Sequence, residues 1–176
     1  SYDLPQPSAK VQNTEVVGID LGLTNFATLS DGTKIENPSF LHRLESKLKR
    51  EQRRLAKKQK CSANRSKQII RLAKTYRTIR NRRQDFLNKL TTLLAKTKQE
   101  IVIENLHVSG MLKNHRLAKS IANASWGEFR RQLEYKTKRF GSFLTVVERF
   151  YPSSKICSIC GFKADLLPLN IRAWTC

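Results

Sequence analysis

The chain has few acidic residues and no long apolar segment. Its 176 residues include 14 Asp and Glu against 34 Lys and Arg, which gives a net charge of +20. No apolar run approaches the roughly 20 residues that cross a bilayer, and the N-terminus has no signal-peptide core. These absences exclude a transmembrane protein and favour a cytoplasmic, nucleoid-associated one. The excess of positive charge indicates a polyanionic partner, nucleic acid first, with a membrane surface as the alternative.

Cysteine is also scarce, and three of the four cysteines lie close together. This usage favours a reducing compartment and a metal site over a disulfide framework. Cys157 and Cys160 form a CxxC, and Cys176 follows 16 positions later. A CxxC, a spacer of about 15 to 20 residues and a second CxxC make a zinc ribbon, in which four thiolates surround the ion. We expect these three cysteines to bind Zn²⁺, with the fourth ligand beyond Cys176 and with Cys61 as a bystander. A redox CxxC is the weaker alternative, because no helix pattern begins at Cys157.

Two short apolar segments each end in a carboxylate. Residues 16–22 (VVGIDLG) place Asp20 at the end of an expected strand, and residues 101–105 (IVIEN) do the same for Glu104. An acid at the end of a buried strand needs a compensating partner. Two such carboxylates on neighbouring strands could hold Mg²⁺ or Mn²⁺ for phosphodiester hydrolysis. The alternative is that Asp20 caps a turn and Glu104 is simply exposed.

The order of the expected elements predicts an α/β domain with a mixed sheet. Residues 16–40 contain three short strands in an antiparallel meander, and two further strands are expected at 101–105 and 143–150. A polar loop at 107–115 and one helix at 116–140 separate those two strands. His107 and His115 in the loop fit surface residues better than metal ligands. We divide the chain into a lead-in or the end of a preceding domain at 1–15, a core at 16–151 and an incomplete ribbon at 152–176. A chain that starts without methionine and stops within a cysteine motif is expected to be a piece of a longer protein.

Residues 41–98 predict two long helices inserted into the core as an antiparallel hairpin. Apolar residues recur at three- and four-residue steps, and on the second helix the expected seam includes Ile69, Tyr76 and Leu93. Residues 61–64 form the turn, with Ser62 or Asn64 as the cap of the second helix.

The hairpin has 20 basic residues and only three acidic ones, Glu45, Glu51 and Asp85. A face that is merely solvated usually mixes both signs, since oppositely charged residues pair along a helix. We therefore predict a surface that follows phosphate groups. The predicted nucleic-acid-binding residues are Arg50, Arg53, Arg54, Lys57, Lys58, Arg65, Lys67, Arg71, Lys74, Arg77 and Arg80.

Taken together, these motifs resemble one family. Residues 18–32 (GIDLGLTNFATLSDG), the basic hairpin, residues 101–106 (IVIENL), residues 151–161 (YPSSKICSICG) and residues 167–176 (LPLNIRAWTC) resemble the transposon-encoded OrfB/TnpB proteins. These are RNA-guided DNA nucleases related to the type V CRISPR effectors. The resemblance runs from about residue 16 to residue 176. It implies a RuvC-type nuclease on an RNase H-like fold, split by a zinc-ribbon insertion, with guide RNA and target DNA as partners.

The resemblance also implies roles for single residues. Asp20 matches the first catalytic acid of the family and Glu104 the second, while Cys157, Cys160 and Cys176 match three zinc ligands. The third catalytic acid of the family follows its fourth cysteine and has no counterpart here, and Asp165 inside the ribbon is a poor substitute. The N-terminal domain that reads guide RNA in such proteins has no counterpart either.

Two other functions remain as alternatives. Residues 18–25 also resemble the first phosphate loop of actin and Hsp70-like ATPases, but seven glycines in the chain do not supply a second glycine-rich loop. The missing third acid favours the other alternative, a non-catalytic fragment that binds nucleic acid through its hairpin and ribbon. Trp126, Trp174 and Tyr151 could stack on bases, although core packing is the better expectation for Trp126.

Overall fold

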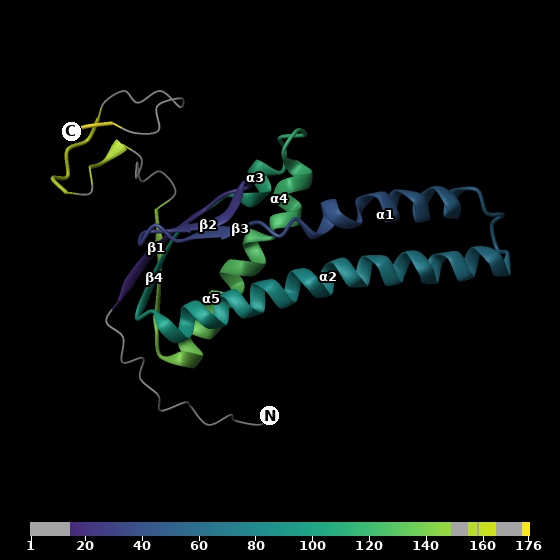
Figure 1. The fold of residues 1–176 in the computed structure, drawn as a ribbon, viewed down its shortest axis with the longest axis horizontal. Helices are drawn as coiled ribbons and strands as arrows, with labels where there is room; N and C mark the ends of the chain where they lie inside the picture. The colour runs from purple at the N-terminus through teal and green to yellow at the C-terminus, as the bar shows by residue number, and fades with distance from the viewer. Residues whose placement is uncertain (1–14, 149–154, 158, 165–173) are drawn as a thin grey trace.

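A computed structural model describes residues 15–148, 155–157, 159–164 and 174–176, and its described strands form one mixed sheet of order β3-β2-β1-β4-β5 (Figure 1). β2 (Asn25–Leu29) pairs antiparallel with β1 (Val16–Leu21) on one side and with β3 (Lys34–Glu36) on the other. β4 (Glu100–Glu104) lies parallel to β1, and β5 (Phe143–Val147) lies parallel to β4. The predicted meander and the mixed sheet are confirmed.

The sheet has one covered face and one open face. Val17, Ile19, Ile101 and Ile103 point into the core and are almost fully buried. Helices α2 (Ala63–Thr97) and α5 (Trp126–Phe140) supply the other side of this core. Phe26 joins the layers, because its ring contacts those of Phe86 and Phe129 edge-on at centroid distances of 5.1 and 5.3 Å. The alternate strand residues, including Asp20 and Glu104, lie on the open face.

The hairpin consists of α1 (Phe40–Ala56) and the N-terminal half of α2. α2 has 35 residues, about 50 Å at 1.5 Å per residue, and Figure 1 shows its first half extending away from the sheet beside α1. The expected apolar seam is wrong in part, since Ile69 and Leu93 are 48 and 60% exposed. Tyr76 is 47% exposed, but its hydroxyl accepts a hydrogen bond from Gln52 of α1 at 2.8 Å. The buried positions of α2 include Gln68 and Thr75 instead.

A buried carboxylate explains this different seam. Glu51 of α1 is only 7% exposed, and a carboxylate removed from water requires hydrogen bonds. Gln68 provides them by donating its side-chain amide to both the carboxylate and the backbone carbonyl of Glu51. Turning Gln68 inward moves the neighbouring Ile69 outward.

The region between β4 and β5 differs from the single helix that we expected. α3 (Val108–Met111) forms within the expected loop, and α4 (Ala118–Ala124) precedes α5. Ser125 interrupts the helix with a left-handed φ of 57°, and this break directs both Ile121 and Trp126 into the core. The expected core position of Trp126 is therefore confirmed. No helix in the described ranges is long and apolar enough to cross a membrane.

We predict that Ser62→Ala destabilises the protein by about 1 kcal/mol, because it removes the N-cap of α2. The Ser62 hydroxyl accepts a hydrogen bond from the Arg65 backbone N–H at 3.2 Å, which decides between the two expected caps. Urea unfolding followed by circular dichroism would measure the change. Ser66→Ala, in the same turn but not at the cap, is the control. Equal stability of the two variants would contradict the capping role.

Candidate functional site

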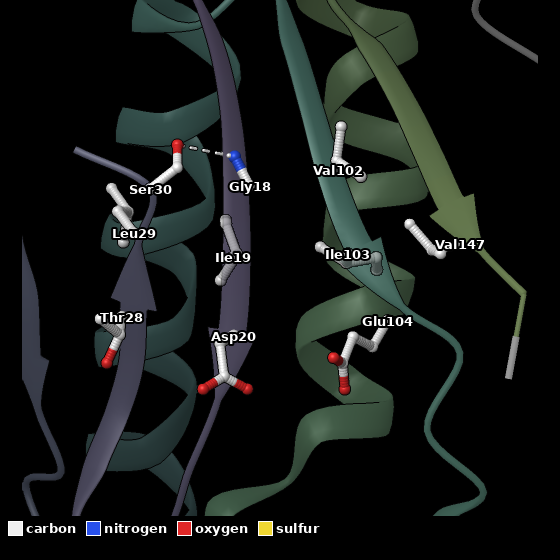
Figure 2. A pocket seen from close by; sticks show the side chains of 10 residues that line it. All are labelled: Gly18, Ile19, Asp20, Thr28, Leu29, Ser30, Val102, Ile103, Glu104 and Val147. Carbon is white, nitrogen blue, oxygen red and sulfur yellow. Dashed lines mark hydrogen bonds between the residues drawn. The ribbon is translucent and has the colours of Figure 1, made fainter. Parts of the chain in front are cut away.

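The two acids that end expected strands lie next to each other. β1 and β4 pair in parallel with Ile19 opposite Ile103, so Asp20 and Glu104 follow at the same level of adjacent strands. Both isoleucines point into the core, and the next residue on each strand therefore faces the open side. Figure 2 shows the two carboxylates at the same end of their strands. The expected adjacency of the strands is confirmed, while the metal-binding role stays a prediction.

A cleft of about 580 Å³ surrounds these two acids. Asp20 is exposed and Glu104 is half-buried at its edge. Among the described residues, no lysine or arginine lines the cleft; the lining residues are Gly18, Ile19, Asp20, Thr28, Leu29, Ser30, Val102, Ile103, Glu104 and Val147. Two neighbouring carboxylates repel each other when both are ionised, and hard oxygen donors suit a hard divalent cation. The residues present therefore fit Mg²⁺ or Mn²⁺.

Sequence reasoning did not find two hydroxyl side chains that line the same cleft, Thr28 and Ser30. For Thr28 the sequence contains the necessary pattern. Asp20 and Thr28 are equally far from Thr24 in the β1–β2 turn, so the two residues pair across the hairpin. Gly22 makes this turn possible: a Cβ at that position would lie 2.9 Å from the Asn25 carbonyl oxygen.

The three clustered cysteines meet as expected. The sulfur atoms of Cys157, Cys160 and Cys176 all lie within 4.8 Å of one another. A tight turn positions the CxxC: the Gly161 N–H donates to the Cys157 carbonyl at 3.0 Å, and the Cys157 N–H donates to the Phe162 carbonyl at 2.9 Å. Gly161 has a φ of +71°, a conformation that favours glycine. These three sulfur atoms can occupy three of the four positions around a tetrahedrally coordinated ion.

The electrostatics of the cluster also favour a cation. Backbone N–H groups of Cys160 and Ile159 lower the pKa of the Cys157 thiol to about 7. In contrast, the sulfur atoms of Cys157 and Cys160 raise the pKa of the Cys176 thiol to about 11. The three thiols therefore cannot all ionise near neutral pH unless a positive ion offsets their repulsion. Thiolate donors favour zinc over magnesium.

We predict that the chain binds one Zn²⁺, or Co²⁺ as a coloured probe, through this cysteine cluster. Cys157→Ser, Cys160→Ser or Cys176→Ser should each weaken the affinity by more than about tenfold. Binding should strengthen from about pH 6 to about pH 8, because the thiols must lose protons. The thiolate-to-cobalt absorption band is the measurement, and Cys61→Ser is the control. Unchanged cobalt binding by the Cys157 variant would refute the site.

The hairpin exposes nearly all of the basic residues that we expect to bind nucleic acid. The three acids of the hairpin do little to neutralise this surface. Glu45 forms salt bridges with Lys49 at 2.7 Å and with Lys119 at 2.6 Å. Hydrogen bonds from these two ammonium groups lower the pKa of the Glu45 carboxyl to about 2, and the bond from Lys119 contributes the most. Asp85 pairs with Lys89, and Glu51 is buried against Gln68. Most of the hairpin's positive charge therefore remains available to a polyanion.

Two grooves run along this surface. One, of about 430 Å³, follows α1 and is lined by Ser46, Lys49, Arg50, Arg53, Arg54 and Lys57. The other, of about 370 Å³, lies between the helices and is lined by Lys47, Glu51, Arg71, Lys74, Thr75 and Thr78. Rows of guanidinium and ammonium groups in a groove suit the regular phosphates of a nucleic-acid backbone.

Arg65 differs from the other residues that we expect to bind nucleic acid. It is half-buried, and its guanidinium donates to the backbone carbonyls of Leu55 at 3.1 Å and Lys58 at 3.2 Å. Leu55 lies in the last turn of α1 and Lys58 just beyond the helix end, so Arg65 ties the start of α2 to the end of α1. A structural contribution of Arg65 is therefore visible, beside the binding role that we expect from the sequence.

The other residues singled out from the sequence lie apart from these sites. His107 and His115 are exposed, and among the described residues neither belongs to a cluster of three or more metal-ligating groups. Trp174 is half-buried, with its ring centroid 6.4 Å from that of Phe162. Tyr151 and Asp165 lie outside the described residues.

Comparisons with known proteins agree with the motifs. The family model OrfB_IS605, described as "Probable transposase", matches residues 1–115, and the model "Cas12f1-like, TNB domain" matches residues 126–176. A Streptomyces pristinaespiralis protein named "Putative RNA-guided DNA endonuclease" is 47% identical over 163 residues, covering 93% of this chain and 40% of that protein. InsQ of Escherichia coli (strain K12), with the same description, is 36% identical over 179 residues, covering 93% and 44%. The chain thus spans less than half the length of these two relatives.

One solved structure has a similar fold. The chain described as "Cryo-EM structure of the Cas12f1-sgRNA-target DNA complex" matches with a TM-score of 0.53 and 18% sequence identity. The match covers 92% of this chain and 41% of that one. At this level of identity the likeness concerns the arrangement of the elements.

Proposed function

Because the chain belongs to the OrfB_IS605 family, we propose that it carries the nuclease core of an RNA-guided DNA endonuclease. The observation that carries this proposal is the placement of Asp20 and Glu104 side by side in a cleft whose described lining residues include no lysine or arginine. The names of the relatives support the choice of DNA as substrate and RNA as guide. The strand order and the likeness to Cas12f1 support a RuvC-type, RNase H-like fold. The family membership disfavours the ATPase alternative.

In this proposal Asp20 and Glu104 hold Mg²⁺ or Mn²⁺, which would activate the attacking water and stabilise the leaving 3′ oxygen. The protein positions both carboxylates through rigid, paired strands rather than through loops. Asp20 is exposed, so a phosphate of the DNA can approach it directly. The thiolates of the ribbon select zinc and the carboxylates select a hard ion, so the two sites do not compete.

The hairpin has a separate task in this proposal. Its grooves would contact the backbone of the guide–target duplex and would position that duplex without reading its sequence. The salt bridge between Glu45 of α1 and Lys119 of α4 connects the hairpin with the rest of the domain. A duplex bound along the hairpin would therefore be held in a defined relation to the sheet.

We predict that Asp20→Asn and Glu104→Gln each reduce divalent-dependent DNA cleavage by the complete protein by roughly 100-fold or more, since each removes a charge worth several kcal/mol to the transition state. Cleavage of a guide-matched DNA would be the measurement. Glu100→Gln is the matched control, because Glu100 lies on the same face of β4 but hydrogen-bonds Thr145 instead. Undiminished cleavage by either acid variant would end the nuclease assignment.

A second candidate function is a nucleic-acid-binding fragment without catalysis. Within the described ranges, no cluster of three potential ligands includes Asp20 and Glu104, so no third carboxylate accompanies the pair there. If this alternative holds, the complete protein binds guided DNA but the acid variants and the unmodified protein cut equally poorly.

We predict that replacing Arg50, Arg53 and Lys57 together by Gln makes nucleic-acid binding less dependent on salt. Each lost phosphate contact reduces the slope of log K against log[salt] by about 0.9 for duplex DNA, so the slope should fall by about 2 to 3. Binding would be measured by fluorescence anisotropy at several salt concentrations. Gln at Lys89, Lys113 and Lys138 removes the same charge outside the grooves and is the control. Equal slopes for the two triple variants would contradict the groove assignment.

A further inference from the structure

Thr28 lies directly opposite Asp20 on the neighbouring strand. The antiparallel register pairs these two residues, and both line the cleft. Side chains that face each other in an antiparallel pair have Cβ atoms about 5 Å apart. Figure 2 shows the Thr28 and Asp20 side chains at the same level of the two neighbouring strands. The hydroxyl can therefore reach the carboxylate after a small side-chain adjustment.

The backbone holds Thr28 firmly in this position. β2 is paired on both sides, and Thr28 faces Lys34 of β3 across its other edge. Its chain neighbours Ala27 and Leu29 are buried at 1 and 7% exposure, which keeps the Thr28 side chain on the cleft face. No hydrogen bond from the Thr28 hydroxyl to any of the described residues is present. Its donor is thus available to a group in the cleft.

We propose that Thr28 is a positioning residue for the metal site, an inference that rests on the proposed function. Its hydroxyl donates a hydrogen bond to one oxygen of the Asp20 carboxylate, and this leaves the other oxygen facing Glu104 and the cation. Asp20 is exposed at the end of its strand. Without this hydrogen bond, its side chain would have to lose torsional freedom when it binds the ion. Partners of this kind orient metal ligands and contribute to metal affinity.

The test is Mn²⁺ binding by the chain, measured from the electron paramagnetic resonance signal of the free ion. Thr28→Val keeps the branched shape that suits a strand but removes the hydroxyl, and we expect about a tenfold weaker affinity. Thr28→Ser restores the hydroxyl and should stay within about twofold of the unmodified chain. Thr145→Val is the control and should bind Mn²⁺ normally. Thr145 lies in β5 on the open face of the sheet, and its hydroxyl donates a hydrogen bond to Glu100 at 2.6 Å.

The outcomes separate this inference from the proposed function. If Asp20→Asn binds Mn²⁺ as well as the unmodified chain, or if the unmodified chain does not bind the ion, the proposed metal site and the role of Thr28 both fail. If Asp20→Asn abolishes binding while Thr28→Val leaves it unchanged, only the role of Thr28 is overturned. A loss in Thr28→Ser or Thr145→Val equal to that in Thr28→Val would overturn it as well, because the effect would not come from this hydroxyl.

Discussion

The parallel pairing of β1 with β4 is the constraint on which the proposed active site depends. These strands are separated in sequence by β2, β3 and the whole hairpin, yet their register aligns Ile19 with Ile103. Burial of both isoleucines enforces this register, because a slip by one residue would turn the buried side chains toward the open face. The same slip would bury Asp20 or Glu104 in an apolar core at a large cost. The core residues thus determine where the two acids meet.

Helix α2 connects the two functional regions. Its C-terminal half contributes Leu87, Leu90 and Leu94 to the core beneath the sheet, whereas its N-terminal half forms the basic hairpin with α1. The hairpin packs partly through a hydrogen-bonded polar pair, Glu51 and Gln68, rather than through apolar residues alone. The Glu51 carboxylate also lies 3.7 Å from the Arg54 guanidinium of its own helix, whereas its hydrogen bond with Gln68 links the two helices. A long basic arm is in this way attached to the sheet through one continuous helix.

The distribution of charge separates three kinds of ligand. No basic side chain is among the described residues that line the cleft around Asp20 and Glu104. The acids of the hairpin are paired or buried, and three cysteines form their own cluster. In the proposed function, a hard divalent cation, a polyanion and zinc would each meet a surface suited to them. In a chain with a net charge of +20, small and apolar residues such as Gly18 and Val102 line the described part of this cleft in place of cationic side chains.

The sequence by itself determined the strands that carry Asp20 and Glu104, the two hairpin helices and the cysteine cluster, because periodicity, charge and ligand spacing are local properties. The sequence did not determine which side of α2 faces α1. The apolar spacing places Ile69 in the seam, but the buried Glu51 needs a hydrogen-bond donor, and Gln68 faces α1 instead. It also missed the break at Ser125, where packing of Ile121 and Trp126 into one core outweighs the helical pattern. The pairing of Thr28 with Asp20 follows from the local β1–β2 turn, whereas the tertiary structure alone decided that Glu104 lies beside Asp20. That adjacency depends on the register between β1 and β4, which long-range burial sets and local sequence does not.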